Sequence, residues 1–243
     1  MHIASRSRRW QQLLTACLLA TTAVGAHAAD AFTDAVAAAY APYRSALFRT
    51  NSQAQAESEQ AIAQARAAWD GVRQRFGTQA PAPYDRDAQF TQTLQAVDSV
   101  YRKAADEIAA RQLPQAHETL EAVRDLLAEQ RQRNGVVVFS DHMNAYHLEM
   151  ERALIDGPKW LQQDGHTLRL VAQAGVLAYL VARLREQAPA SLKADADFER
   201  ALAAVEASVN QLREAAQSQD LARTKAALGQ VKAPYSRLFL RFG

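Results

Sequence analysis

The sequence is nearly devoid of cysteine, with one residue, Cys17, in 243. Cys17 lies inside an N-terminal segment with the features of a cleaved secretory signal. We therefore expect a mature chain without a thiol or a disulfide, a composition that tolerates an oxidising compartment without making use of it. This absence excludes a disulfide-stabilised scaffold and thiol chemistry in the mature protein.

The N-terminal segment has the three parts of a signal peptide. Arg6, Arg8 and Arg9 form a basic region without acidic residues, and an uncharged apolar run follows at residues 13–25. The sequence AHA then supplies the small residues that a signal peptidase requires, so the mature chain is expected to begin at Ala29. We predict a signal peptide at residues 1–28 and a periplasmic mature protein.

Two other export signals compete with this interpretation. The sequence LTAC, which ends at Cys17, resembles a lipoprotein box, but the apolar run before it is short. Arg8 and Arg9 resemble a twin-arginine signal, but Gln11 and Gln12 stand where apolar residues are needed.

The mature chain also lacks a basic surplus. The full sequence has 28 Lys and Arg against 26 Asp and Glu, and three of the basic residues precede Ala29. The mature chain therefore carries 25 basic and 26 acidic side chains, a net charge of −1. This balance gives no reason to expect a nucleic-acid partner.

Strand-like alternation is nearly absent, and the 9 glycines and 7 prolines cluster at a few boundaries. Alanine, leucine, glutamine, glutamate and arginine dominate, so the composition predicts an all-α fold. The most apolar stretch, residues 170–182, is too short to span a bilayer and is expected to be a buried helix. We therefore predict no transmembrane segment in the mature chain.

Local signals place four helices in the first half of the mature chain. The first is expected at residues 33–49, bent at Pro42, and the second runs from a capping box at residues 52–55 to Gly77. Asp87 is expected to cap the third helix, and Pro114 to lie in the first turn of the fourth.

The pattern then repeats with an offset of about 108 residues, beginning with the sequence QAPA at residues 79–82 and 187–190. Matching core and cap positions are Asp87 and Asp195, Phe90 and Phe198, Leu94 and Leu202, Val97 and Val205, Leu120 and Leu228, and Val123 and Val231. The sequence thus predicts two tandem four-helix-bundle-like repeats, residues 29–135 and residues 136–243.

Each repeat has a proline-rich linker, a capped third helix, a short turn and an alanine-rich fourth helix. In these features the chain resembles a tandem duplication of the periplasmic soluble cytochrome b and cytochrome c-prime bundles, best over residues 81–132 and 189–242. In the cytochrome b family a methionine of the first helix and a histidine late in the fourth hold the haem. Met143 matches the former, but residues 129–134 and 237–242 contain no histidine, and no CxxCH motif occurs. The resemblance therefore implies the fold without a recognisable haem site.

One central stretch, residues 134–154, has the residue types of a metal site. It contains both methionines and two of the four histidines that follow residue 29. Met143, His147 and Met150 share one helix face, with His142 nearby, and thioethers with imidazole suit copper. The alternative is that the methionines fill the core and that His147 finds an ordinary hydrogen bond.

Two other features have simpler interpretations. His117 with Glu118 and Glu121 only superficially resembles a zinc-protease helix, because a second histidine is missing, and we expect a solvated face there. The aromatic C-terminus, residues 233–243, either closes the core of the second repeat or forms a docking end.

Nothing in the sequence indicates a catalytic set. We expect a non-enzymatic periplasmic binding protein that holds a soft metal ion or small ligand near the seam between the repeats. The alternative is an envelope protein–protein interaction or chaperone-like module without a ligand. The expected partner is accordingly a small ligand or an unknown envelope protein.

Overall fold

The computed structural model describes residues 30–243, and the predicted signal peptide and its cleavage site lie outside them. The described chain consists of ten α-helices and one short 3₁₀ helix, with no strand, so the predicted all-α class is confirmed. The duplication of the chain stays a prediction.

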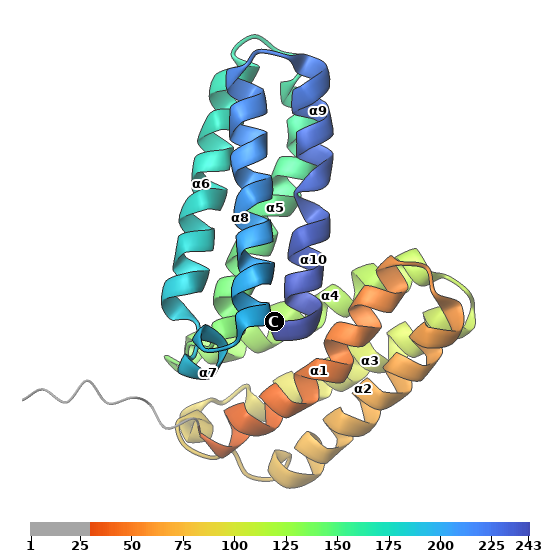
Figure 1. Ribbon diagram of the computed structural model, residues 1–243. Coiled ribbons are helices and arrows are strands. Elements are labelled where there is room, and N and C mark those ends of the chain that lie inside the picture. The colour runs from red at the N-terminus through yellow and green to blue at the C-terminus, as the bar shows by residue number, and fades with distance from the viewer. Residues whose placement is uncertain (1–29) are drawn as a thin grey trace, which may run out of the picture.

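The helices fall into two sets in chain order. The first set comprises α1 (Ala31–Asn51), α2 (Gln55–Phe76), α3 (Phe90–Ala109) and α4 (Leu113–Arg133). The second comprises α5 (Phe139–Trp160), α6 (His166–Gln187), the short α7 (Ala190–Lys193), α8 (Ala196–Gln217), α9 (Leu221–Gln230) and α10 (Lys232–Phe242). Helices pack mainly within their own set, and the lower end of the second set rests against α1 and α4 of the first (Figure 1).

Each set buries residues at the three- and four-residue spacing of a helix face. Trp69 of α2 and Tyr101 of α3 meet in the first core, where the Trp69 indole donates to the carbonyl of Leu94. Tyr146 of α5 stacks on Tyr235 of α10 in the second core. These four aromatic side chains lie inside the two cores, and their burial stabilises the helices that carry them.

Several predicted caps are displaced by a few residues. Ser52 ends α1 instead of starting α2, because its hydroxyl donates back to the carbonyls of Phe48 and Arg49. Asp87 lies in the turn before α3, where it accepts from the Gln89 amide, and the helix begins at Phe90. Pro114 occupies the first turn of α4 as predicted.

The chain between the sets is short. Gly135 adopts a positive φ of 66°, which reverses the chain after α4. Helix α5 begins at Phe139, and Asp141 sits in its first turn, where it accepts from the Val138 amide at 3.0 Å. This tight connection holds the start of α5 beside the end of α4.

The C-terminal part of the chain is divided into two helices near a proline. Helix α9 ends at Gln230, and α10 begins at Lys232, with Pro234 in its first turn. Leu238 and Phe239 are buried, and Phe242 contacts Phe198 edge-on at 5.4 Å. The aromatic tail therefore closes the lower end of the second core and reaches α1.

Among the described helices, α6 is long and apolar enough to cross a membrane by length and composition, a test that core helices also pass. One face of α6 buries Leu170, Leu177 and Leu184. The opposite face leaves Leu168 75% exposed and Tyr179 63% exposed. The sequence prediction of a buried helix is therefore correct for one face only.

Candidate functional site

The seam, where α1 and α4 meet α5 and α10, is held by polar contacts from both sides. The Arg131 guanidinium of α4 pairs with the Asp141 carboxylate of α5, and its Nε lies 3.0 Å from both carboxylate oxygens. Arg131 is 5% exposed and the Asp141 side chain is 23% exposed, so this ion pair is partly buried. Arg44 of α1 donates through Nε to the carbonyl of Leu240 in α10 at 3.3 Å.

A cavity of about 300 Å³ lies at the seam and is lined from both helix sets; we call it the seam cavity. Its wall is mostly apolar and aromatic, with Phe32, Val36, Tyr84, Leu127, Phe139, Leu192 and Phe242. Its polar lining is Thr33, Tyr40, Arg44, Gln130, Arg131 and Ser140, and none of the described residues lining it is acidic. The cavity volume reaches the lower end of the range of small-molecule sites, about 300–1,000 Å³.

Two buried donors on this wall are without a partner in the described chain. They are the Tyr40 hydroxyl and the Gln130 Nε2 group, on side chains 6% and 1% exposed. Asn144 of α5 lies beside the Tyr40 hydroxyl, but the two groups lack hydrogen-bond geometry, and the Asn144 amide is unpartnered too. Because a buried unpaired donor costs about 1–3 kcal/mol, these groups are the ones a bound acceptor would satisfy.

Tyr40 sits among arginines. Burial raises the pKa of Tyr40 to about 12, although Arg124, Arg131 and Arg44 act in the opposite direction. The hydroxyl therefore stays protonated near neutral pH and is available as a donor. Arg44 also lies over the Tyr40 ring, with its guanidinium carbon 6.0 Å from the ring centroid.

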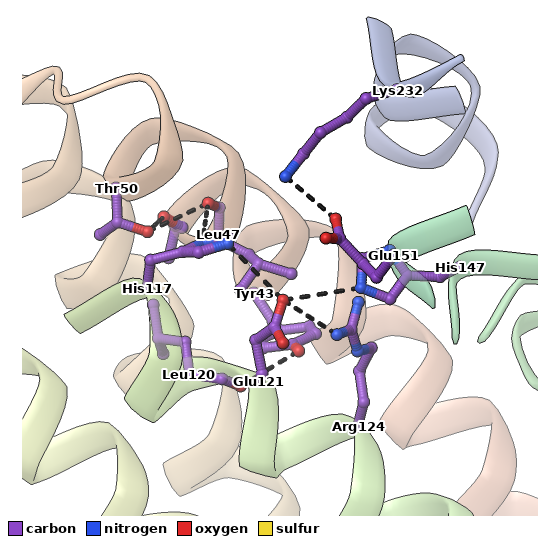
Figure 2. Close-up of polar contacts among 11 residues, drawn as sticks. Tyr43, Leu47, Thr50, His117, Leu120, Glu121, Arg124, His147, Glu151 and Lys232 are labelled. Atoms are coloured by element: carbon purple, nitrogen blue, oxygen red, sulfur yellow. Dashed lines mark hydrogen bonds and ion pairs between the residues drawn. The ribbon is translucent and has the colours of Figure 1, made fainter. Parts of the chain in front are cut away.

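A second polar group surrounds Glu121 of α4, and we call it the Glu121 cluster (Figure 2). Glu121 Oε1 lies 3.0 Å from Arg124 Nη2, 3.5 Å from His117 Nε2 and 3.6 Å from His147 Nε2. Because His147 belongs to α5, this carboxylate also crosses the seam. Next to it, Lys232 of α10 pairs with Glu151 of α5 at 3.0 Å.

The cluster holds Glu121 ionised. Burial alone would raise the pKa of Glu121, but contacts with His147, Arg124 and His117 outweigh burial and lower that pKa to about 2. For His117 the balance is reversed, since burial lowers its pKa more than Glu121 and the Leu47 carbonyl raise it. Protonation of Glu121 or of His117 is therefore disfavoured in the folded protein.

His117 is half-buried, so the prediction of a solvated face there is wrong. Its Nδ1 lies 3.1 Å from the Leu47 carbonyl of α1. A carbonyl can only accept, so Nδ1 carries the proton and the ring is fixed in orientation. His117 thus ties α4 to α1, and its place in a helix-pair contact is a tertiary feature that the local sequence does not indicate.

The structure brings two of the four predicted metal ligands to one place. His147 and Met150 line a small cavity of about 40 Å³ beside the Glu121 cluster, whereas Met143 and His142 do not line it. Met143 is fully buried, and its carbonyl accepts from Tyr235 at 2.9 Å. Burial lowers the pKa of His142, and Arg183 of α6 lowers it further.

Among the described residues, no group of three or more His, Cys, Asp or Glu side chains is placed to hold a metal ion. That finding does not address thioether ligands. Copper at Met143, His147, Met150 and His142 therefore stays a prediction.

No family model, no curated protein and no solved structure matches this chain.

Sequence reasoning missed the seam cavity and most of its polar residues. Tyr40 and Gln130 are 90 positions apart in the sequence and have no motif around them. The signal that was available is weak: Arg124, Gln130 and Arg131 fall on the inner face of a helix whose other inner residues are apolar. Polar residues at such positions indicate a partner or a ligand.

The Glu121 cluster predicts loss of stability on acidification. A carboxylate with a lowered folded-state pKa stabilises the fold above about pH 4.5, and this contribution is lost as the pH falls toward 2. His117 acts in the same direction below about pH 6.5, because the unfolded chain takes up its proton more readily. We expect the melting temperature measured by circular dichroism to fall through this window, and to fall less steeply in Glu121→Gln. Glu118→Gln, exposed on the same helix, is the control, and identical pH profiles for Glu121→Gln and the wild type would contradict the assignment.

Two neighbouring tyrosines of α1 give a matched test of the unpartnered hydroxyl. Tyr40→Phe removes a buried donor without a partner and is expected to raise the unfolding free energy by about 1 kcal/mol. Tyr43→Phe removes the bond from Tyr43 to the Leu120 carbonyl at 3.2 Å and is expected to lower it by about the same amount. Urea unfolding measures both, and equal destabilisation by the two changes would show that Tyr40 is satisfied within the protein.

Proposed function

We propose that this protein is a non-enzymatic periplasmic binding protein that holds a small, largely apolar molecule in the seam cavity. The observation that carries the proposal is the combination of a cavity of about 300 Å³ with two unpartnered buried donors on its wall, Tyr40 and Gln130. A mostly apolar wall with a few convergent polar groups is typical of small-molecule sites. The periplasmic location is part of the proposal and rests on the signal-like sequence of residues 1–28.

The lining supports binding in preference to catalysis. A general base near neutral pH needs a group that readily takes up a proton. The described lining has no Asp, Glu, His, Lys or Cys, and its Tyr40 has a pKa raised to about 12. The side chains on this wall can orient and retain a molecule, whereas proton transfer at neutral pH finds no suitable group among them.

We also infer that the two helix sets arose by duplication, in the manner of tandem bundles resembling the soluble cytochrome b and cytochrome c-prime proteins, without a haem site. Two pairs of matched residues support the inference. Phe90 and Phe198 both lie in the first turn of a helix, at the starts of α3 and α8, and both are buried. Leu120 of α4 and Leu228 of α9 are likewise both buried. A binding site at the junction of the two copies would have no counterpart in a single, unduplicated repeat.

A second candidate, an interaction or chaperone-like module, is favoured by the exposed apolar side chains of the second set. Leu148 and Ile155 of α5, with Leu168 and Tyr179 of α6, are at least 60% exposed. Native mass spectrometry with metal analysis of protein purified from the periplasm separates the candidates. An added small-molecule mass favours seam binding, bound copper favours the histidine–methionine site, and the bare chain mass favours interaction with another protein.

Filling the seam cavity is the direct test of binding. Ala37 of α1 lines the cavity and is exposed, so Ala37→Phe adds a ring to the cavity with little disturbance of the core. The neutral fluorophore N-phenyl-1-naphthylamine is the probe, and we expect Ala37→Phe to weaken its binding by at least about tenfold, about 1.4 kcal/mol. Ala38→Phe is the control, because Ala38 is the next exposed residue of α1 but lies outside the cavity. Equal probe affinity in all three proteins, or none in the wild type, would contradict seam binding.

A further inference from the structure

The charges around the seam cavity do not balance. Three arginines surround Tyr40 at the seam, and two of them are neutralised: Arg131 by Asp141 and Arg124 by Glu121. Arg44 is the third, and it forms no ion pair with any Asp or Glu of the described chain. Its polar contact is one bond from Nε to the Leu240 carbonyl.

Arg44 is also partly withdrawn from water. Burial lowers the pKa of Arg44, against an opposing effect of Tyr40. A half-buried guanidinium whose terminal nitrogens remain available is a strong donor for an anionic oxygen. Tyr40, with its free hydroxyl, lies directly beneath it.

We propose that the molecule held in the seam cavity is an amphipathic monoanion, a carboxylate on a compact apolar or aromatic body. This assignment rests on the proposed binding function and names its ligand class. The carboxylate is held by the Arg44 guanidinium and accepts from the Tyr40 hydroxyl and Gln130 Nε2. The body lies against the aromatic wall formed by Phe32, Phe139 and its neighbours.

The single surplus charge selects a monoanion. One unpaired guanidinium balances one carboxylate, whereas the second charge of a phosphate monoester would enter the seam uncompensated. No acidic side chain lines the described wall, and an ammonium group bound there would meet the positive charge of Arg44. The same arrangement therefore disfavours cationic molecules.

The test uses a matched set of probes on the full mature chain. The probes are 4-phenylbutyrate, its uncharged amide, the corresponding amine and the phosphate ester of 4-phenylbutanol, each displacing N-phenyl-1-naphthylamine. We expect the carboxylate to bind about tenfold or more tightly than the amide, because a charged hydrogen bond replaces a neutral one. The amine is expected to be weakest.

Two substitutions test whether Arg44 causes the preference for the carboxylate over the amide. Arg44→Gln is expected to bring the carboxylate to within about twofold of the amide, because it lowers the affinity for the carboxylate more than the affinity for the amide. Arg66→Gln, which removes an exposed positive charge from α2, is expected to leave the carboxylate preference intact. Should Arg44→Gln fail to fold by circular dichroism, Tyr40→Phe supplies the second variant, and it is expected to weaken carboxylate binding more than amide binding.

The outcomes separate the ligand class from the binding function. Equal affinities for carboxylate and amide in the wild type would overturn the monoanion and leave seam binding standing. Tighter binding of the phosphate ester than of the carboxylate would overturn it as well. A wild type that binds neither the fluorophore nor any probe would overturn both proposals.

Discussion

The ion pair between Arg131 and Asp141 fixes how the two helix sets meet. It joins the end of α4 to the first turn of α5, and Asp141 also caps α5 by accepting from the Val138 amide. A partly buried ion pair adds little net stability, since desolvation offsets most of its attraction, but breaking it by removing one partner is costly. Its effect is therefore to specify one geometry for the seam. Gly135 assists, because its positive φ turns the chain back within a few residues.

The seam cavity follows from that geometry. Helices that meet along their lengths interdigitate and leave few voids, whereas here the lower end of the second set rests against the sides of α1 and α4 (Figure 1). Side chains at such a junction cannot fill all the space between the sets. Tyr40 and Gln130 at this junction keep buried donors without a partner, and Arg44 keeps a charge without an ion pair in the described chain. In the neighbouring part of the seam, the Glu121 cluster and the Lys232–Glu151 ion pair join the two helix sets (Figure 2). The charges there are paired, whereas Arg44 has no ion-pair partner in the described chain.

Much of the fold could be predicted from the sequence, because it depends on local signals. The helix-rich composition, the apolar spacing of α3 and α4, and the proline in the first turn of α4 each act over a few residues. The cap at Ser52 was misassigned because a serine at a helix boundary can bond backward as well as forward, and only the Gln53 conformation, with φ at 56°, decides it. His117 was misread because its partner, the Leu47 carbonyl, is 70 residues away. The seam cavity depends on the packing of two sets of helices, which no local pattern encodes. The histidine–methionine stretch was visible in the sequence, and the structure places its methionines in the core, so the copper prediction still awaits a metal titration.

A double-mutant cycle across the seam tests the central claim, that the Arg131–Asp141 pair sets the geometry of a ligand site. Arg131→Gln, Asp141→Asn and the double variant are compared with the wild type in unfolding free energy and in affinity for N-phenyl-1-naphthylamine. Asparagine keeps an acceptor for the Val138 amide, and Asp141 does not line the cavity, so any effect of its change on the probe must act through the seam. The account predicts a coupling energy of at least about 1 kcal/mol together with weaker probe binding in Asp141→Asn. Additive effects within about 0.5 kcal/mol, with probe affinity unchanged in Asp141→Asn, would contradict it.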